Sequence, residues 1–207
     1  MSRPSLVTQR IELRPMTSAH LPLLVSLDAD AEVMRFILGR ARTRAEVHRF
    51  WGPICADLQA DAVGLGWWVG FARGGQAPST RSPDDATDLA DFFGWWDLSP
   101  ALPLADPDLA PERAELGYRL ARAHWGAGLA TEGARALVAH GFDTVGLHTV
   151  WAETMAVNAG SRGVMRRLGL HHVRTELREW DHPLPGAELG EVVYEITREE
   201  WLQGRDT

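Results

Sequence analysis

A turn that carries two glycines, placed between an expected strand and an expected helix, constrains the fold more than any other feature of this sequence. Residues 114–121 alternate between apolar and polar as on a strand, and Gly126 and Gly128 follow within a few positions. From 130 to 142 the apolar residues recur at helical spacing, and residues 147–155 are typical of a buried strand. A strand, a helix and a strand in this order predict a right-handed crossover and a parallel strand pair.

The remaining segments add strands and helices around the same sheet. Further strands are expected at 6–13, 66–73, 91–98, 172–180 and 191–196, and further helices at 21–27, 43–58 and 158–169. The connections 74–89 and 99–111 are rich in Gly, Pro, Ser and Asp, which are typical of loops. We therefore expect an α/β (α+β) fold that forms a single domain over residues 1–207.

Charge and cysteine content narrow the classes of function. The formal net charge is −7, which disfavours a surface that follows nucleic-acid phosphates and favours a cationic partner such as an amine. All 21 basic residues are Arg, so a Walker-type phosphate loop and a lysine Schiff base are both excluded. Cys55 is the only cysteine, and we expect it to be packed in a helix as a structural thiol.

The sequence shows no pattern for membrane insertion, secretion or metal binding. No apolar run approaches the roughly 20 residues of a membrane span, and residues 1–10 lack the apolar core of a secretory signal. We expect a cytoplasmic protein that binds neither a membrane nor nucleic acid. The eight histidines form no His-x-x-x-His pattern on an expected helix, so the sequence predicts no metal site.

The glycine turn is a candidate anion site. Gly126 and Gly128 let backbone N–H groups converge, and the helix that follows adds unpaired N–H groups and the positive end of its dipole. A pyrophosphate would be held there without a lysine, and Thr131 adds a hydroxyl. The glycines are also compatible with a tight turn alone. A dinucleotide fingerprint is disfavoured, because Thr131 stands where a small residue is needed and residues 146–151 include no ribose-binding acid.

Several ordered motifs resemble one protein family. Residues 116–120 (Leu-Gly-Tyr-Arg-Leu) precede the turn, and residues 125–132 (Trp-Gly-Ala-Gly-Leu-Ala-Thr-Glu) form it. Residues 158–161 (Asn-Ala-Gly-Ser) begin a later helix and residues 167–170 (Arg-Leu-Gly-Leu) end it. With the opening strand 11–15 (Ile-Glu-Leu-Arg-Pro), these motifs resemble the GNAT superfamily of N-acetyltransferases, specifically its ribosomal-protein (RimJ/RimL-like) branch.

This resemblance implies a mixed, mostly antiparallel sheet of about seven strands that splays between its fourth and fifth strands, with helices on both faces. Acetyl-CoA would bind in the gap as the co-substrate, without a metal. The turn would hold the pyrophosphate, residues 120–122 would pair with the pantetheine arm, and Asn158 would contact the same arm. The coenzyme-binding residues are expected to be Leu120, Ala121, Arg122, Trp125, Gly126, Ala127, Gly128, Leu129, Ala130, Thr131, Asn158 and Ser161.

Acetyl transfer to an amine needs a base for the ammonium proton and a proton donor for the departing thiolate. Glu115 and Glu153 lie in the two strands expected to flank the gap, and we favour Glu115 as the base, acting directly or through water. Each carboxylate is equally compatible with an ordinary ion pair to an arginine. The resemblance implies that Ser161 lies near the sulfur and protonates the thiolate, although Asn158 and Ser161 are also typical of a helix N-terminus.

These observations together predict an enzyme. We expect an N-acetyltransferase that moves the acetyl group of acetyl-CoA to a primary amine by direct attack in a ternary complex. The amine is either a protein N-terminus or a small molecule, and a homodimer is one option for the assembly. The main alternative is a non-catalytic acyl-CoA-binding regulatory module, and a nucleotide-binding oxidoreductase is disfavoured. The doublets Trp67-Trp68 and Trp95-Trp96 either line an acceptor pocket or, as we favour, pack in the core.

Overall fold

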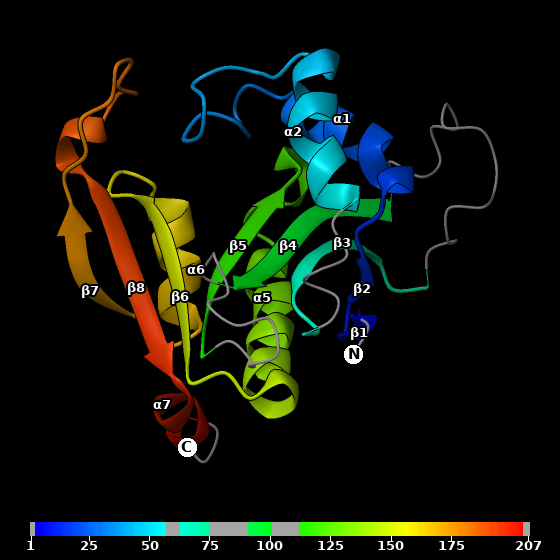
Figure 1. Cartoon of the computed structure of the whole chain (residues 1–207), viewed down its shortest axis with the longest axis vertical. Coiled ribbons are helices and arrows are strands. Elements are labelled where there is room, and N and C mark those ends of the chain that lie inside the picture. Colours follow the sequence, from blue (N-terminus) through cyan, green and yellow to red (C-terminus); the bar gives the residue numbers. More distant parts are fainter. Residues whose placement is uncertain (1–2, 57–62, 75–90, 101–111, 205–207) are drawn as a thin grey trace.

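The protein is built around one eight-stranded sheet (Figure 1). The computed structural model describes residues 3–56, 63–74, 91–100 and 112–204. Its strands lie in the order β1-β2-β3-β4-β5-β6-β8-β7. Their bounds are β1 (Leu6–Val7), β2 (Ile11–Pro15), β3 (Gly66–Ala72), β4 (Phe92–Pro100), β5 (Arg113–Leu120), β6 (Thr149–Met155), β7 (His171–Glu176) and β8 (Glu191–Thr197). Neighbouring strands are antiparallel except β5 and β6, which are parallel, so the mixed and mostly antiparallel sheet is confirmed.

Helices cover both faces of the sheet, as predicted. They are α1 (Leu21–Asp28), α2 (Arg44–Ala56), α5 (Leu129–His140), α6 (Ala159–Arg167) and the short α7 (Arg198–Gln203). Figure 1 shows α1 and α2 on one side of the central strands and α5 and α6 on the other. Within the described part of the chain, no helix combines the length and apolar composition that a membrane crossing requires.

Each face of the sheet has its own apolar core, and the tryptophan doublets divide between the two. Trp68 and Trp96 are fully buried in the core that includes α5. Trp95 lies in the core beneath α2, where Trp67 packs against it at a centroid separation of 4.8 Å. Successive strand residues point to opposite faces, so a doublet contributes one ring to each core when both faces are covered. The preference for core packing over an acceptor pocket is therefore confirmed.

Two predicted strands differ from the observed ones. The expected strand 6–13 is divided by a turn in which the Thr8 N–H bonds the Ile11 carbonyl at 2.9 Å, which makes β1 an additional edge strand. The expected strand 172–180 ends at Glu176, because its partner β8 begins at Glu191 and offers no residue for further pairing. Of the expected loops, residues 75–89 and 101–111 lie outside the described residues, as do positions 57 and 58 of the expected second helix.

A buried carboxylate fixes α1 to the sheet. Asp28, at the end of α1, is fully buried and accepts hydrogen bonds from Arg119 of β5 at 2.6 Å and from Arg42 at 3.0 Å. The indole N–H of Trp51 in α2 donates to the same carboxylate at 3.0 Å. A buried charge is tolerated when it is paired and hydrogen-bonded in this way. The network therefore sets the position of α1 and of the segment that follows it relative to β5.

Candidate active site

A gap opens in the sheet where β5 and β6 diverge. The parallel ladder joins three residue pairs, the last of which is Glu115 with Trp151. Beyond this point β5 stays paired with β4 through Leu120, and β6 stays paired with β8 through Met155. The facing edges of β5 and β6 therefore separate, and Figure 1 shows the two strands spreading apart above their contact. This is the splay expected between the fourth and fifth strands. The first expected strand is observed as two strands, β1 and β2, so the expected fourth and fifth strands are β5 and β6.

The glycine turn closes the open end of β5. Gly126 and Gly128 have φ values of 73° and 80°, in the left-handed region that favours glycine. Gly128 precedes α5 without a side-chain cap, and the first helical bond runs from the Glu132 N–H to the Gly128 carbonyl at 3.0 Å. The N–H groups of residues 129–131 are therefore left without intrahelical partners, as an anion at a helix N-terminus requires.

A tryptophan from the neighbouring strand holds this helix end in place. The indole N–H of Trp96 donates to the Ala130 carbonyl at 3.1 Å, and a Cβ on Gly133 would lie 2.5 Å from the same ring. Helix α5 thus packs directly on β4 through a position that only glycine fits. The predicted pyrophosphate site is fixed to the sheet by this contact.

The segment predicted to pair with pantetheine already has its carbonyls engaged. The Leu120 carbonyl accepts the Trp125 indole N–H at 2.8 Å, while the Ala121 and Arg122 carbonyls accept backbone N–H groups of the turn. The Ala121 N–H bonds the Phe93 carbonyl at 2.9 Å, toward β4. Because backbone groups alternate along a strand, those of Tyr118 and Leu120 point toward the gap. Pairing with an extended arm would therefore use this open edge of β5.

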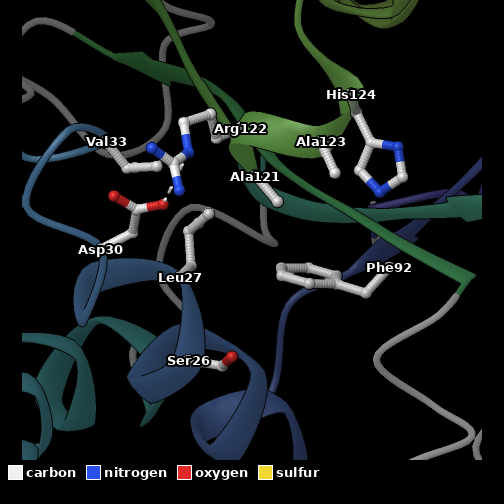
Figure 2. Close-up of a pocket in the computed structure, with 9 residues that line it drawn as sticks. All are labelled: Ser26, Leu27, Asp30, Val33, Phe92, Ala121, Arg122, Ala123 and His124. Atoms are coloured by element: carbon white, nitrogen blue, oxygen red, sulfur yellow. Dashed lines mark ion pairs between the residues drawn. The ribbon is translucent and has the colours of Figure 1, made fainter.

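The Arg122 side chain points away from the gap. Its guanidinium lies 3.4 Å from the Asp30 carboxylate, beyond the end of α1. Figure 2 shows this pair at a pocket of about 540 Å³ that the turn forms with α1 and β4. The lining residues are Ser26, Leu27, Asp30, Val33, Phe92, Ala121, Arg122, Ala123 and His124. Any contact of Arg122 with the coenzyme would thus come from its backbone.

A hydrogen-bonded chain crosses the gap on the face of the sheet that α5 and α6 cover. Asn158 caps α6, because its Oδ1 accepts the Ser161 N–H at 3.1 Å, and its Nδ2 donates to Thr154 at 3.0 Å. The Tyr118 hydroxyl of β5 donates to the Ser161 carbonyl and lies 3.0 Å from the Ser161 Oγ. Burial raises the pKa of the Tyr118 hydroxyl, so it remains protonated at neutral pH. The sequence places Tyr118 in the expected strand but indicates no role for it.

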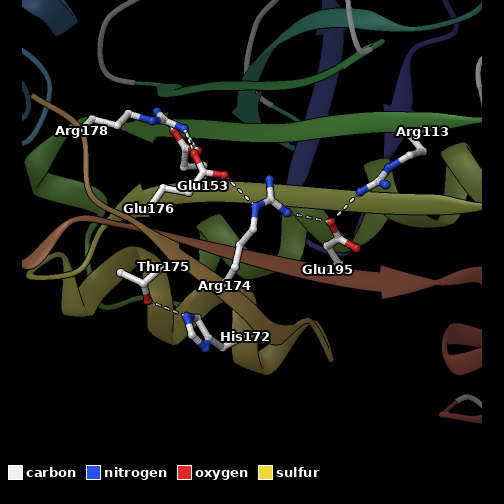
Figure 3. Close-up of polar contacts among 8 residues, drawn as sticks. All are labelled: Arg113, Glu153, His172, Arg174, Thr175, Glu176, Arg178 and Glu195. Atoms are coloured by element: carbon white, nitrogen blue, oxygen red, sulfur yellow. Dashed lines mark hydrogen bonds and ion pairs between the residues drawn. The ribbon is translucent and has the colours of Figure 1, made fainter.

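The two predicted carboxylates lie on the opposite side of the gap. Glu115 pairs in register with Trp151, two residues before Glu153, so both carboxylates leave the same face of the sheet. Figure 3 shows Glu153 held by Arg178, whose two terminal nitrogens lie 2.6 Å from its oxygens. The Glu115 carboxylate, in contrast, has no hydrogen bond or ion pair within the part of the chain that the structure describes.

The electrostatic surroundings distinguish the two carboxylates further. Burial is the main cause that raises the pKa of the Glu115 carboxyl, the negative charge of Glu153 adds a smaller rise, and Arg178 partly offsets both. A carboxylate with a raised pKa is a stronger base for an ammonium proton. Glu153 has Arg178 as a direct ion-pair partner, which leaves Glu115 as the carboxylate of the two without a paired cation among the described residues.

A third carboxylate, which sequence reasoning missed, lies beside Glu115. Asp97 of β4 is 5% exposed, and the Ser99 hydroxyl donates to it at 2.8 Å. Burial raises the pKa of the Asp97 carboxyl to about 8. Asp97 lies over Gly117, where a Cβ would approach its Oδ1 to 2.1 Å. The available signal was the acidic residue that directly follows Trp95-Trp96 inside the expected strand 91–98.

Comparison with known proteins gives one family. Residues 10–171 match the model of the acetyltransferase (GNAT) domain. The chain is 41% identical over 207 residues to the FsC-acetyl coenzyme A-N(2)-transacetylase of Aspergillus fumigatus, covering 98% of this chain and 80% of that protein.

Solved structures share the fold at low sequence identity. A spermidine N-acetyltransferase from Vibrio cholerae, in complex with CoA and spermine, aligns with a TM-score of 0.67 and 14% identity over 94% of this chain and 99% of its own. The ribosomal L7/L12 alpha-N-protein acetyltransferase RimL, in complex with CoA, aligns with a TM-score of 0.67 and 16% identity over 92% and 96%.

Proposed function

The chain belongs to the GNAT acetyltransferase family and is an acetyl-CoA-dependent N-acetyltransferase, and from this premise we propose that it acetylates the primary amine of a small molecule with Glu115 as the base. The observation that carries the proposal is the Glu115 carboxylate, unpaired among the described residues, at the point where β5 and β6 part. The name of the 41% identical relative, which specifies N(2) as the acetylated nitrogen, supports a small-molecule acceptor over a protein N-terminus. The RimL-like branch stays a prediction, supported by fold similarity alone.

The residues suit the co-substrate. The uncapped start of α5 offers N–H groups to the pyrophosphate, and the open edge of β5 offers N–H and carbonyl groups to the pantetheine arm. Acetyl-CoA supplies the acetyl group as a thioester. The residues described include no cluster of three or more His, Cys, Asp or Glu that could hold a metal ion.

The chemistry divides between the two sides of the gap. Glu115 accepts the ammonium proton, so that the neutral amine can form a bond to the thioester carbon. The open-edge N–H groups of β5 donate to the oxygen on which negative charge develops. Ser161, hydrogen-bonded to Tyr118, supplies the proton that the sulfur takes up as the carbon–sulfur bond breaks. The nitrogen bonded to the acetyl carbon loses its second proton as the carbon–sulfur bond breaks, and this proton restores the Ser161 hydroxyl directly or through water. The products are the acetylated amine and CoA, and Glu115 returns its proton to solvent.

The proposal is tested by binding and turnover in one preparation. Acetyl-CoA is titrated into the protein by calorimetry beside NADH, and thiol release is then followed with a panel of small amines and of peptides with free N-termini. The absence of lysine removes side-chain self-acetylation as a background. Acetyl-CoA binding with thiol release for small amines supports the proposal. Preferred turnover of peptides overturns the acceptor class, and binding without turnover of any amine favours the non-catalytic module.

A further inference from the structure

A cluster of polar contacts joins the N-terminal hairpin, β1 and β2, to the glycine turn. We call it the clasp, and it connects Thr8 and Arg10 with Glu132 and the Ala127 carbonyl. Glu132, in the first turn of α5, receives the Thr8 hydroxyl at 2.6 Å and the Arg10 backbone N–H at 2.8 Å on one oxygen. Its other oxygen receives the Arg10 Nε at 2.7 Å and lies 2.7 Å from Nη2. The third guanidinium nitrogen, Nη1, donates to the Ala127 carbonyl inside the turn at 2.9 Å.

The clasp places a cation directly beside the predicted pyrophosphate site. A Cβ on Gly128 would lie 3.5 Å from Arg10 Nη2, so the missing side chain leaves the guanidinium open toward the turn. The Arg10 side chain is 47% exposed, which leaves room for a ligand. A guanidinium carries five N–H groups, and its contacts with Glu132 and Ala127 use three of them. Two N–H groups remain for an anion.

Charge balance at the turn requires such a cation. The chain has no lysine, and the arginines near the turn in sequence have other partners: Arg122 pairs with Asp30, Arg119 with Asp28, and Arg135 donates to the Arg167 carbonyl at 2.7 Å. Glu132 would by itself repel a pyrophosphate from the N–H groups of its own helix end. Arg10 neutralises this carboxylate and is held rigidly by it, as is favourable for bidentate recognition of phosphate.

We propose that Arg10 is a coenzyme-binding residue, which donates its two remaining N–H groups to the pyrophosphate while Glu132 and the Ala127 carbonyl hold it in place. The proposal rests on the pyrophosphate lying at the glycine turn. It adds a charged side chain from the N-terminal hairpin to a pyrophosphate site that the sequence predicts from backbone N–H groups and the Thr131 hydroxyl. Glu132 is then a positioning residue for Arg10.

The test compares a donor that carries phosphates with one that does not. For Arg10→Ala, the Kd of acetyl-CoA measured by calorimetry should rise about tenfold to a hundredfold, the range expected for a lost hydrogen bond to a charged group. The kcat/KM with S-acetylpantetheine, which lacks the pyrophosphate, should remain that of the wild type. Arg10→Lys keeps the charge but loses the paired donor nitrogens of the guanidinium, and should give a smaller rise in the Kd of acetyl-CoA. The difference between wild type and Arg10→Ala should shrink at high salt.

A matched control contacts the same hairpin. Arg73, which follows β3, donates to the Thr8 carbonyl at 3.2 Å and not to the Ala127 carbonyl or Glu132, so Arg73→Ala should bind acetyl-CoA as the wild type does. An unchanged Kd for acetyl-CoA in Arg10→Ala, or an equal loss with both donors, would overturn the proposal. If Arg10→Ala does not fold, the same two-donor comparison with Arg10→Lys decides. Failure of the wild type itself to bind acetyl-CoA would count against the proposed function instead.

Discussion

The two sides of the gap between β5 and β6 are built from different chemical groups. On the face covered by α5 and α6, the groups that we propose for co-substrate binding are backbone N–H and carbonyl groups and the hydroxyls of Tyr118 and Ser161. The other face carries carboxyl groups, with Asp97, Glu115 and Glu153 leaving one face of three adjacent strands. Backbone recognition suits a co-substrate that is the same for the whole family, whereas side chains can differ from one acceptor to the next. Changes on the two sides should therefore affect different kinetic constants.

The largest effect is expected from Glu115→Gln. Loss of the base should lower kcat by about 10²-fold to 10⁴-fold, while the Kd of acetyl-CoA stays the same. Because the pKa of Glu115 is raised, the wild-type kcat/KM should fall as the pH drops through a value above that of an ordinary glutamate. The variant should lose this limb of the pH–rate profile.

Glu153→Gln is the matched control for the base. Its carboxylate is already paired with Arg178, so its removal should cost far less in kcat. If Glu153→Gln abolished turnover while Glu115→Gln retained it, the assignment of the base would be reversed.

Gly128→Val should instead affect the co-substrate side. A β-branched residue at a φ of 80° is strained, and its side chain would meet Arg10 and block the N–H groups of α5. We expect the Kd of acetyl-CoA, measured by calorimetry, to rise on the order of a hundredfold.

Gly146→Val separates strain from binding. Gly146 has a φ of 85° and lies beyond the far end of α5, where an added Cβ would have no described atom within 4 Å. Both variants should lose stability, but the Gly146 variant should keep its affinity for acetyl-CoA. Equal affinities for the two variants would contradict the location of the pyrophosphate.

Tyr118→Phe should produce a smaller loss. Removal of the hydroxyl breaks both contacts with Ser161, so we expect kcat to fall about tenfold and stability to fall by about 1 kcal/mol. The matched change Tyr194→Phe removes a longer contact with Arg162, 3.4 Å, and should leave kcat unchanged. Full turnover by Tyr118→Phe would show that Ser161 acts without it.

The smallest effect on turnover is expected from Asp97→Asn, which should act on stability instead. The folded-state pKa of about 8 exceeds the ordinary value, so between these two values the folded protein binds a proton that the unfolded chain lacks. The free energy of unfolding of the wild type should therefore fall as the pH rises toward 8. Asp97→Asn has no such group. The free energy of unfolding of the variant, relative to that of the wild type, should therefore grow by on the order of 1 kcal/mol per unit of pH over this range. Urea unfolding at several pH values measures this difference, and a difference independent of pH would refute the prediction.

Local patterns were sufficient for the glycine turn and for most of the strands and helices. Gly126 and Gly128 were identified because a strand, a turn and a helix leave periodic signals in consecutive residues. The contacts between side chains were not predictable in this way. Tyr118 meets Ser161 across 43 positions and Arg10 meets Glu132 across 122, and no local pattern encodes such pairs. A single domain over residues 1–207 stays a prediction.

The three residue pairs between β5 and β6 also bear on how the protein resists unfolding. Beyond Glu115 the sheet lacks a strand, and the pantetheine arm would occupy its place. Bound acetyl-CoA would then complete the sheet and stabilise the folded state. A ligand that binds only the folded state stabilises it by about 2.7 kcal/mol at a hundred times its Kd. Amide hydrogen exchange at Tyr118 and Leu120 should slow when acetyl-CoA binds. The time for which the protein stays folded would then depend on the concentration of its own co-substrate.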